Sequence, residues 1–230
     1  MRIDSGDLAY LSKMARKMLD DAGFKGAKVY ASNELDEEVI ESLKNQGAAI
    51  AVWGVGTKLA TAFSQPALGG VYKLTAIDDP KGAWQPKLKV SEQSLKINNP
   101  GVQQIRRFRD GSEFAGDMIF DVSTEPKPET VRGKPKWVIH DPVESTRRKS
   151  IEPGTPYEDL LVPVLRGGKR VYKAPPLSEV RARTQTQLAG FHEGIRRFVN
   201  PHRYPVGLDR QLHDLRAALV LDARGGGKER

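Results

Sequence analysis

Three short polar turns near the N-terminus carry residue types that can bind a charged sugar. They are Arg2-Ile-Asp-Ser-Gly-Asp7, Ser32-Asn-Glu-Leu-Asp36 and Gly54-Val-Gly-Thr57. Each turn follows a short apolar segment and precedes a helical pattern. The carboxyl ends of parallel strands converge, and helix N-termini direct free N–H groups to the same place. Together the turns predict one site for a phosphorylated sugar.

The first turn holds the candidate catalytic residue, Asp4. Ile3 ends a predicted strand, so Asp4 projects into the mouth of the site. A carboxylate there can accept sugar hydroxyls, contact a hydrated magnesium ion, or stabilise positive charge on an anomeric carbon. Ser5 is a candidate substrate contact or a helix cap. Asp7 is interpreted as a helix cap.

The second and third turns supply candidate substrate contacts. Ser32 and Asn33 are small polar residues that suit hydrogen bonding to a ligand, but both are also ordinary helix N-caps. The glycines of Gly54-Val55-Gly56-Thr57 let the backbone approach an anion, with N–H groups lining a concave nest and the threonine donating its hydroxyl. The motif lacks the Gly-Lys-Ser/Thr ending of a nucleotide P-loop.

These turns require an alternating α/β framework. Apolar periodicity predicts amphipathic helices over 8–19 and 35–44 and strands over 27–31 and 48–53. The last of these segments is nearly all apolar, which is typical of a parallel strand covered on both faces. Short links between the elements predict right-handed βαβ units in a parallel sheet.

After about residue 80 the sequence becomes rich in Pro and Gly, and these residues separate short segments in which apolar and polar residues alternate. The expected elements are a β-hairpin of 102–109 and 117–122, a Pro-rich arm over 124–156, helices over 177–199 and 209–223, and a disordered end at 225–230. We expect the arm to lie on another surface and to take no part in a core.

Charge and composition exclude several classes of protein. The net charge is +8, but residues 1–80 hold 9 Lys and Arg against 11 Asp and Glu. The excess of positive charge therefore lies in residues 81–230. Its clusters are short and scattered without a nucleic-acid motif, which favours a solvated surface or an acidic partner domain over nucleic acid. No window reaches the roughly 18 apolar residues of a membrane span, and no signal core is present. We expect a cytoplasmic protein. The absence of cysteine excludes disulfides and thiolate chemistry.

The residues and the order of these motifs resemble the C-terminal half of the nicotinate phosphoribosyltransferase family. The matching segments are Arg2–Leu8, Ala31–Glu37, Trp53–Thr57, Pro66–Leu74, Asn99–Gly101, Asp141-Pro142 with Thr146-Arg147-Arg148, and Asn200–Pro205. The resemblance implies an irregular α/β barrel joined to an α/β sandwich domain. It implies an enzyme that joins nicotinate to phosphoribosyl pyrophosphate, giving nicotinate mononucleotide and pyrophosphate, with Mg²⁺ required and ATP hydrolysis coupled.

The resemblance also implies residue roles. Gly54, Val55, Gly56 and Thr57 would hold the 5′-phosphate, Asp4 and Asn33 would face the ribose, and Arg2 would lie near the nicotinate. It further suggests a homodimer with sites completed across its interface. No protein metal ligand is assigned.

The sequence departs from the family because it begins inside the barrel. We therefore expect an α/β fold in which 1–80 form the incomplete half of an irregular, TIM-like barrel. Residues 81–230 form a mixed β-hairpin and helical C-terminal region. The histidine that ATP phosphorylates in the family belongs to the missing N-terminal half. His140 is given no such role, and His192, His202 and His213 are interpreted as surface or capping residues.

Two hypotheses follow. The first is a phosphoribosyltransferase portion that is active only with its N-terminal half. The second is a non-catalytic remnant that binds phosphate or a partner.

Overall fold

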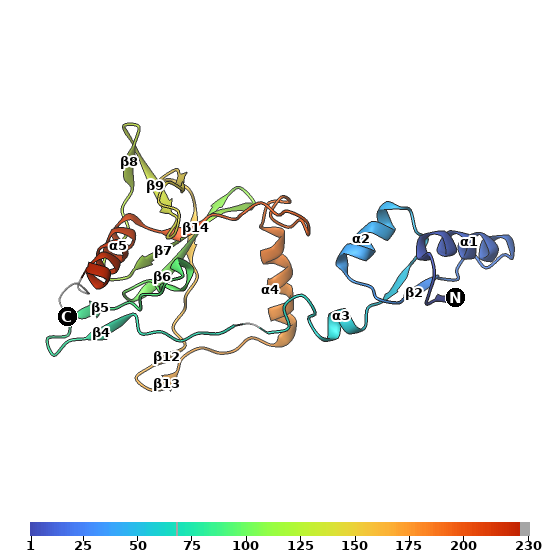
Figure 1. Ribbon diagram of the computed structural model, residues 1–230, viewed down its shortest axis with the longest axis horizontal. Helices are drawn as coiled ribbons and strands as arrows, with labels where there is room; N and C mark the ends of the chain where they lie inside the picture. The colour runs from blue at the N-terminus through green and yellow to red at the C-terminus, as the bar shows by residue number, and fades with distance from the viewer. Residues whose placement is uncertain (68, 226–230) are drawn as a thin grey trace. The chain divides into compact units, whose positions relative to one another are not determined.

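The computed structural model describes residues 1–67 and 69–225, and it divides into two compact units, Met1–Val71 and Tyr72–Arg230 (Figure 1). The sequence placed the change near residue 80. The hairpin of β4 (Ala76–Asp78) and β5 (Trp84–Pro86) spans that position, so the second unit begins earlier. Within the described residues, no helix is long and apolar enough to cross a membrane.

The first unit is a three-stranded parallel sheet with helical crossovers. Its elements are β1 (Arg2–Ile3), α1 (Leu8–Asp21), β2 (Tyr30–Ser32), α2 (Glu37–Asn45), β3 (Val52–Gly54) and α3 (Thr57–Ala60). The strands lie in the order β1-β2-β3, with Ile3 opposite Ala31 and Ala31 opposite Trp53. This arrangement confirms the α/β prediction. The closure of a TIM-like barrel stays a prediction.

Local sequence signals explain the helices of this unit. The Asp7 carboxylate accepts a hydrogen bond from the Tyr10 amide at 3.0 Å, which confirms its role as the cap of α1. Asp36 caps α2 by accepting from the Val39 amide at 2.9 Å. Apolar residues of the helices and strands then form one core, made of Ile3, Leu8, Ala9, Ala15, Val29, Ala31, Leu35 and Leu43.

The strand predicted over 48–53 differs from expectation in length and burial. Only Val52–Gly54 form β3, and the Val52 side chain is 39% exposed. The apolar run therefore indicates a surface that is only partly covered in the first unit, and not a strand buried on both faces.

The second unit is built on a mixed sheet with the strand order β10-β9-β14-β7-β6-β11, and β8 pairs with β9. The strands are β6 (Gln103–Asp110), β7 (Glu113–Asp121), β8 (Glu129–Val131), β9 (Lys134–His140), β10 (Arg148–Ile151), β11 (Tyr157–Asp159) and β14 (Val206–Leu208). A short 3₁₀ helix (Ser94–Lys96) precedes the sheet, and β12 (Leu165–Arg166) and β13 (Lys169–Arg170) form a separate hairpin. The hairpin predicted around 110–112 is confirmed as β6–β7.

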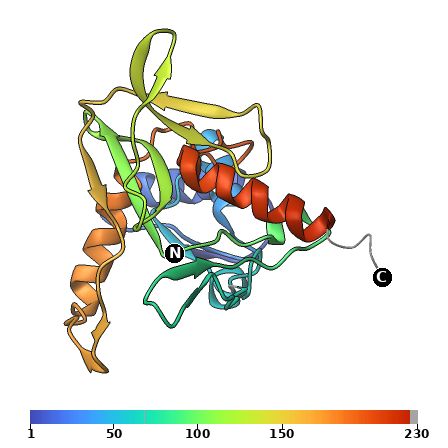
Figure 2. The ribbon, with the colours of Figure 1, turned by 90° about the vertical axis from the view of Figure 1, so that its left-hand side faces the viewer.

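Two helices accompany this sheet, α4 (Leu177–Ala189) and α5 (Arg210–Gly225), and α5 packs against β7 and β9 (Figure 2). Helix α5 confirms the prediction for 209–223. Its cap is Asp209, whose carboxylate accepts from the Leu212 amide at 3.1 Å. The predicted disordered end falls largely on 226–230, outside the described residues, whereas Gly225 is the last residue of α5.

The helix predicted over 177–199 was too long. It ends at Ala189 because Gly190 lies against the Phe114 ring, where an added Cβ would be 2.6 Å from Cε2. The Phe114 amide also donates to the Gly190 carbonyl at 2.7 Å. The chain is thereby tied to β7 and cannot continue the helix.

The prediction of a Pro-rich arm without a core was wrong. Residues 124–156 contain β8, β9 and β10, and the side chains of Val138, Ile139 and Ile151 are buried. Pro126 and Pro128 precede β8, Pro142 follows β9, and Pro153 and Pro156 follow β10, whereas Pro135 is the second residue of β9. The prolines therefore lie between strands or near the start of one, where they do not prevent strand pairing.

Candidate functional site

The carboxyl ends of β1, β2 and β3 form a cavity of about 260 Å³ in the first unit. Its lining residues are Arg2, Asp4, Ser32, Asn33, Glu34, Leu35, Gly54, Gly56, Thr57 and Lys58. Ser5 and Val55 are the sequence-predicted residues that do not line it. Ser5 is exposed, and the Val55 side chain packs against the hydrophobic core of this unit.

A short chain of polar contacts joins β1 to β2. The Arg2 Nε donates to the Ser32 Oγ at 2.9 Å, and that hydroxyl donates to the Asp4 Oδ1 at 2.5 Å. Arg2 also forms an ion pair with Asp4 at 3.1 Å. The three side chains, from two adjacent strand ends, hold one another at the cavity.

These contacts set the charge of Asp4. The hydrogen bond from Ser32, followed by the contacts with Arg2, lowers the pKa of the Asp4 carboxyl below its usual value. Asp4, which as an ordinary aspartate would already be ionised at neutral pH, therefore keeps its charge to lower pH. Its side chain is 61% exposed, so the second carboxylate oxygen can accept from a ligand.

Gly54 and Gly56 serve different purposes. A Cβ on Gly54 would lie 2.1 Å from the Tyr30 hydroxyl, so this glycine makes room for a side chain of β2. A Cβ on Gly56 would meet no atom within 4 Å. Gly56 therefore leaves open space in front of the backbone, and it is the position where an anion can approach.

The backbone after Gly56 offers hydrogen-bond donors. Among the described residues, the amides of Thr57, Lys58 and Leu59 have no hydrogen-bond acceptor, because they form the first turn of α3. Thr57 and Lys58 also line the cavity. Free amides and a hydroxyl in one cavity suit a phosphate group.

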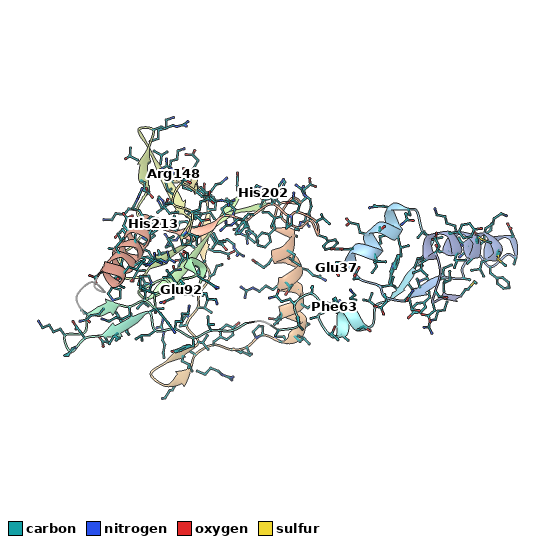
Figure 3. All side chains as sticks on the ribbon, in the orientation of Figure 1. Glu37, Phe63, Glu92, Arg148, His202 and His213 are labelled. Atoms are coloured by element: carbon teal, nitrogen blue, oxygen red, sulfur yellow. The ribbon has the colours of Figure 1, made fainter. Side chains whose placement is uncertain are left out.

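Lys58 is a site residue that the sequence interpretation missed. Its Nζ lies 3.5 Å from the Asp36 carboxylate and 3.8 Å from the centroid of the Phe63 ring, which Figure 3 labels. The Val39 amide first, and Lys58 in addition, lower the pKa of Asp36 despite its partial desolvation. The signal was present in the sequence, since a lysine directly follows the Gly-Val-Gly-Thr motif.

Asn33 has an unusual backbone conformation at the end of β2. Its φ is +116°, a region that non-glycine residues rarely adopt, and its side chain accepts from the Glu34 amide at 3.1 Å. Such strain is typical of residues that a site holds in place.

The described residues contain no group of three His, Asp or Glu side chains that could hold a metal ion. Asp4 is the single carboxylate of the β1 turn that reaches the cavity.

The histidines lie mostly outside any site. His140 is buried, with Nε2 2.6 Å from the Glu129 carboxylate, and its ring lies 5.2 Å from that of His213. It thus ties β9 to β8 and α5. The His192 Nδ1 accepts from the Gly194 amide at 3.1 Å, which closes a turn after α4 and does not cap a helix.

Comparison with known proteins identifies the family. A family model of the nicotinate phosphoribosyltransferase C-terminal domain matches residues 102–216. Nicotinate phosphoribosyltransferase from Bacillus subtilis is 42% identical over 212 residues, which cover 90% of this chain and 41% of that protein. The human enzyme of the same name is 31% identical, over 94% of this chain and 39% of that protein.

The fold gives the same result. A crystal structure of human nicotinic acid phosphoribosyltransferase matches 95% of this chain and 39% of that chain, with a TM-score of 0.65 and 26% identity. The chain thus spans about two fifths of the length of the relatives it matches. On these matches, the chain belongs to the nicotinate phosphoribosyltransferase family.

Proposed function

We propose that the cavity at the ends of β1, β2 and β3 binds the ribose 5-phosphate end of phosphoribosyl pyrophosphate in a nicotinate phosphoribosyltransferase reaction of NAD salvage. The observation that carries the proposal is the placement of free amides after Gly56 in the same cavity as the ionised Asp4. One part suits a phosphate and the other suits a sugar that develops positive charge.

Each part of the cavity then has a role. The amides of Thr57 and Lys58, with the Thr57 hydroxyl and the Lys58 ammonium, hold the 5′-phosphate. Asp4 and Asn33 face the ribose hydroxyls, and Arg2 attracts the carboxylate of nicotinate. The nicotinate ring nitrogen donates its electron pair to the anomeric carbon, whose bond to pyrophosphate oxygen breaks. The negative charge of Asp4 stabilises the oxocarbenium character of that transition state.

Magnesium and ATP are part of this proposal. A magnesium ion usually binds through one or two carboxylates together with substrate phosphates and waters, so a single carboxylate such as Asp4 fits a metal delivered with pyrophosphate. The metal would neutralise charge on the departing pyrophosphate. We assign ATP coupling to the part of the family that this chain does not span.

We propose that the activity requires more than these residues. Arg2 and Asp4, which line the cavity, are each 61% exposed. We propose that the remaining family segment, and a second subunit of a homodimer, complete the site. The same exposure supports the alternative of a non-catalytic module that binds phosphate only.

A reconstitution experiment tests the proposal. The chain is produced together with the N-terminal segment of the Bacillus subtilis enzyme that precedes the matched region, and formation of nicotinate mononucleotide is measured. Activity is expected for the combination. Binding of phosphoribosyl pyrophosphate without turnover would favour the non-catalytic module.

Gly56→Val tests the phosphate nest in the same system. The side chain would fill the open space in front of the amides, so affinity for phosphoribosyl pyrophosphate should fall at least roughly tenfold. Gly26→Val is the matched control, because a Cβ there also meets no atom within 4 Å and lies outside the cavity lining. Undiminished affinity in Gly56→Val would refute the nest.

A further inference from the structure

A second cavity, of about 180 Å³, lies at the β10 end of the sheet in the second unit. Two segments distant in the sequence form it, Asp141 with Arg147–Lys149, and His202–Val206. Figure 3 labels Arg148 and His202, one from each segment. Both segments carry family motifs, yet the proposed reaction gives neither of them a role.

The cavity has an excess of positive charge. Its lining includes the cationic side chains of Arg147, Arg148, Lys149 and Arg203, against the single carboxylate of Asp141. Asp141 pairs with Arg203 at 3.0 Å, and Arg147 pairs at 3.7 Å with a glutamate outside the lining. Within the described part of the chain, neither Arg148 nor Lys149 has a carboxylate within 4 Å.

The segment that carries Arg147–Lys149 is held in place by Asp141. Its buried carboxylate accepts from the amides of Val143 at 2.9 Å and Glu144 at 3.0 Å, and its own amide donates to the Arg147 carbonyl at 3.0 Å. Burial opposes ionisation of Asp141, but the two amides and Arg203 outweigh it, so the pKa of Asp141 is lowered. An ionised Asp141 orients the Arg203 guanidinium at the cavity.

The opposite segment is equally well anchored. The Tyr204 hydroxyl donates to the Asp117 carboxylate at 2.8 Å, and the His202 amide donates to the Gly194 carbonyl at 2.8 Å. Asn200 takes a φ of +49°, which turns the chain before His202. The cationic residues of the lining thus belong to two anchored segments and not to one flexible tail. Arg148 and Lys149 follow each other in β10, so their side chains leave opposite faces of the strand, and Arg148 also lines a neighbouring cavity with Lys134 and Lys136.

We propose that this cavity binds a phosphate-type oxyanion, either free phosphate or the phosphoryl group of a metabolite. Guanidinium groups match the geometry of phosphate oxygens and bind them through paired hydrogen bonds. The volume has room for a tetrahedral oxyanion. This cavity belongs to the second unit and the nest after Gly56 belongs to the first, and the proposal does not depend on the phosphoribosyltransferase proposal.

Calorimetric titration with inorganic phosphate tests the site on the 230-residue chain. All titrations use the Gly56→Val background, which removes the front nest, and a constant ionic strength set with sodium chloride. Arg148→Ala with Lys149→Ala should weaken phosphate binding at least roughly tenfold. The matched control is Lys169→Ala with Arg170→Ala, which removes the same charge from the exposed β12–β13 hairpin.

The control pair should leave the phosphate affinity unchanged. Equal weakening by the two pairs would show that only net charge matters, and no weakening by the Arg148 and Lys149 pair would equally overturn the proposal. All titrated variants carry Gly56→Val and therefore lack the nest after Gly56. These outcomes are thus independent of the test of the phosphoribosyltransferase proposal.

A second titration distinguishes the sources of the phosphoryl group. AMP and adenosine are compared under the same conditions, and AMP should bind more tightly than adenosine because only AMP carries a phosphoryl group. AMP affinity close to that of inorganic phosphate identifies the free anion as sufficient, whereas tighter AMP binding identifies a phosphorylated metabolite. Adenosine that binds as tightly as AMP would contradict an oxyanion site.

Discussion

Two neighbours, Ser32 and Arg2, come from different strand ends, hold the Asp4 carboxylate by hydrogen bond and ion pair, and lower its pKa. The sequence predicted the positions of all three at the cavity because side chains directly after parallel strands share one edge of the sheet. It could not predict that the serine bridges the other two. Lys58 was missed for a similar reason, since its place in the cavity follows from the start of α3 and its contact with Asp36.

Asp4→Asn should lower the kcat of the reconstituted enzyme roughly hundredfold, because one preorganised charge at the developing cation is removed. The melting temperature should change little, since Asp4 is exposed. Steady-state kinetics and thermal melting check the two effects. An unchanged kcat would remove Asp4 from the mechanism.

Asn33→Gly should separate stability from binding. Glycine adopts a positive φ without strain, so the free energy of unfolding should stay the same or rise by up to about 1 kcal/mol. Affinity for phosphoribosyl pyrophosphate should fall, because the amide side chain toward the ribose is lost. Urea unfolding measures the free energy of unfolding, and a binding titration measures the affinity for phosphoribosyl pyrophosphate. Lower stability together with unchanged affinity would contradict the interpretation of Asn33 as a strained site residue.

At the scale of elements, the two units differ in how far the sequence could predict them. In the first unit, helix periodicity, the Asp7 cap and short links are local signals, and they gave the correct order of strands and helices. In the second unit, β14 consists of three residues that pair with β7 and β9, which lie far away in the sequence. No local pattern indicates that insertion. The prolines of 124–156 also concealed β8, β9 and β10.

Gly207 is the position that lets β14 enter the sheet. A Cβ there would lie 2.2 Å from the His140 carbonyl oxygen, a backbone atom that cannot move aside without disturbing β9. Gly207→Ala should therefore lower the free energy of unfolding by about 1–3 kcal/mol, the usual cost of overpacking. Gly154→Ala is the control, since a Cβ there meets no atom within 4 Å. Urea denaturation of both variants measures the difference, and equal stabilities would exclude a tight passage at Gly207.

For the whole molecule, the resemblance in scattered motifs was the strongest prediction, and the family match over residues 102–216 confirms it. The composition alone did not lead there, because the positive charge of the rear could belong to several classes of protein. Barrel closure, metal, ATP and the dimer stay predictions. The metal and ATP are ligands that no single residue of this chain specifies. Barrel closure and the dimer involve the three fifths of the family length that this chain does not span.

Each unit has its own hydrophobic cluster, and this organisation leads to a prediction for the whole chain. The cluster around Ile3, Ala31 and Leu43 contains residues of the first unit alone, and the cluster around Phe108 contains residues of the second alone. A core substitution should therefore loosen its own unit and leave the other unit's amides protected.

Leu43→Ala and Leu212→Ala test this in a reciprocal way. Both side chains are buried, at 7% and 1% exposure, so each truncation should cost about 2–5 kcal/mol in its own unit. Hydrogen exchange should accelerate in β2 and β3 for Leu43→Ala, and in β7 and β9 for Leu212→Ala. If either variant accelerated exchange equally in both units, the chain would unfold as one cooperative unit. A truncation in one core would then lower the stability of both units by the same amount.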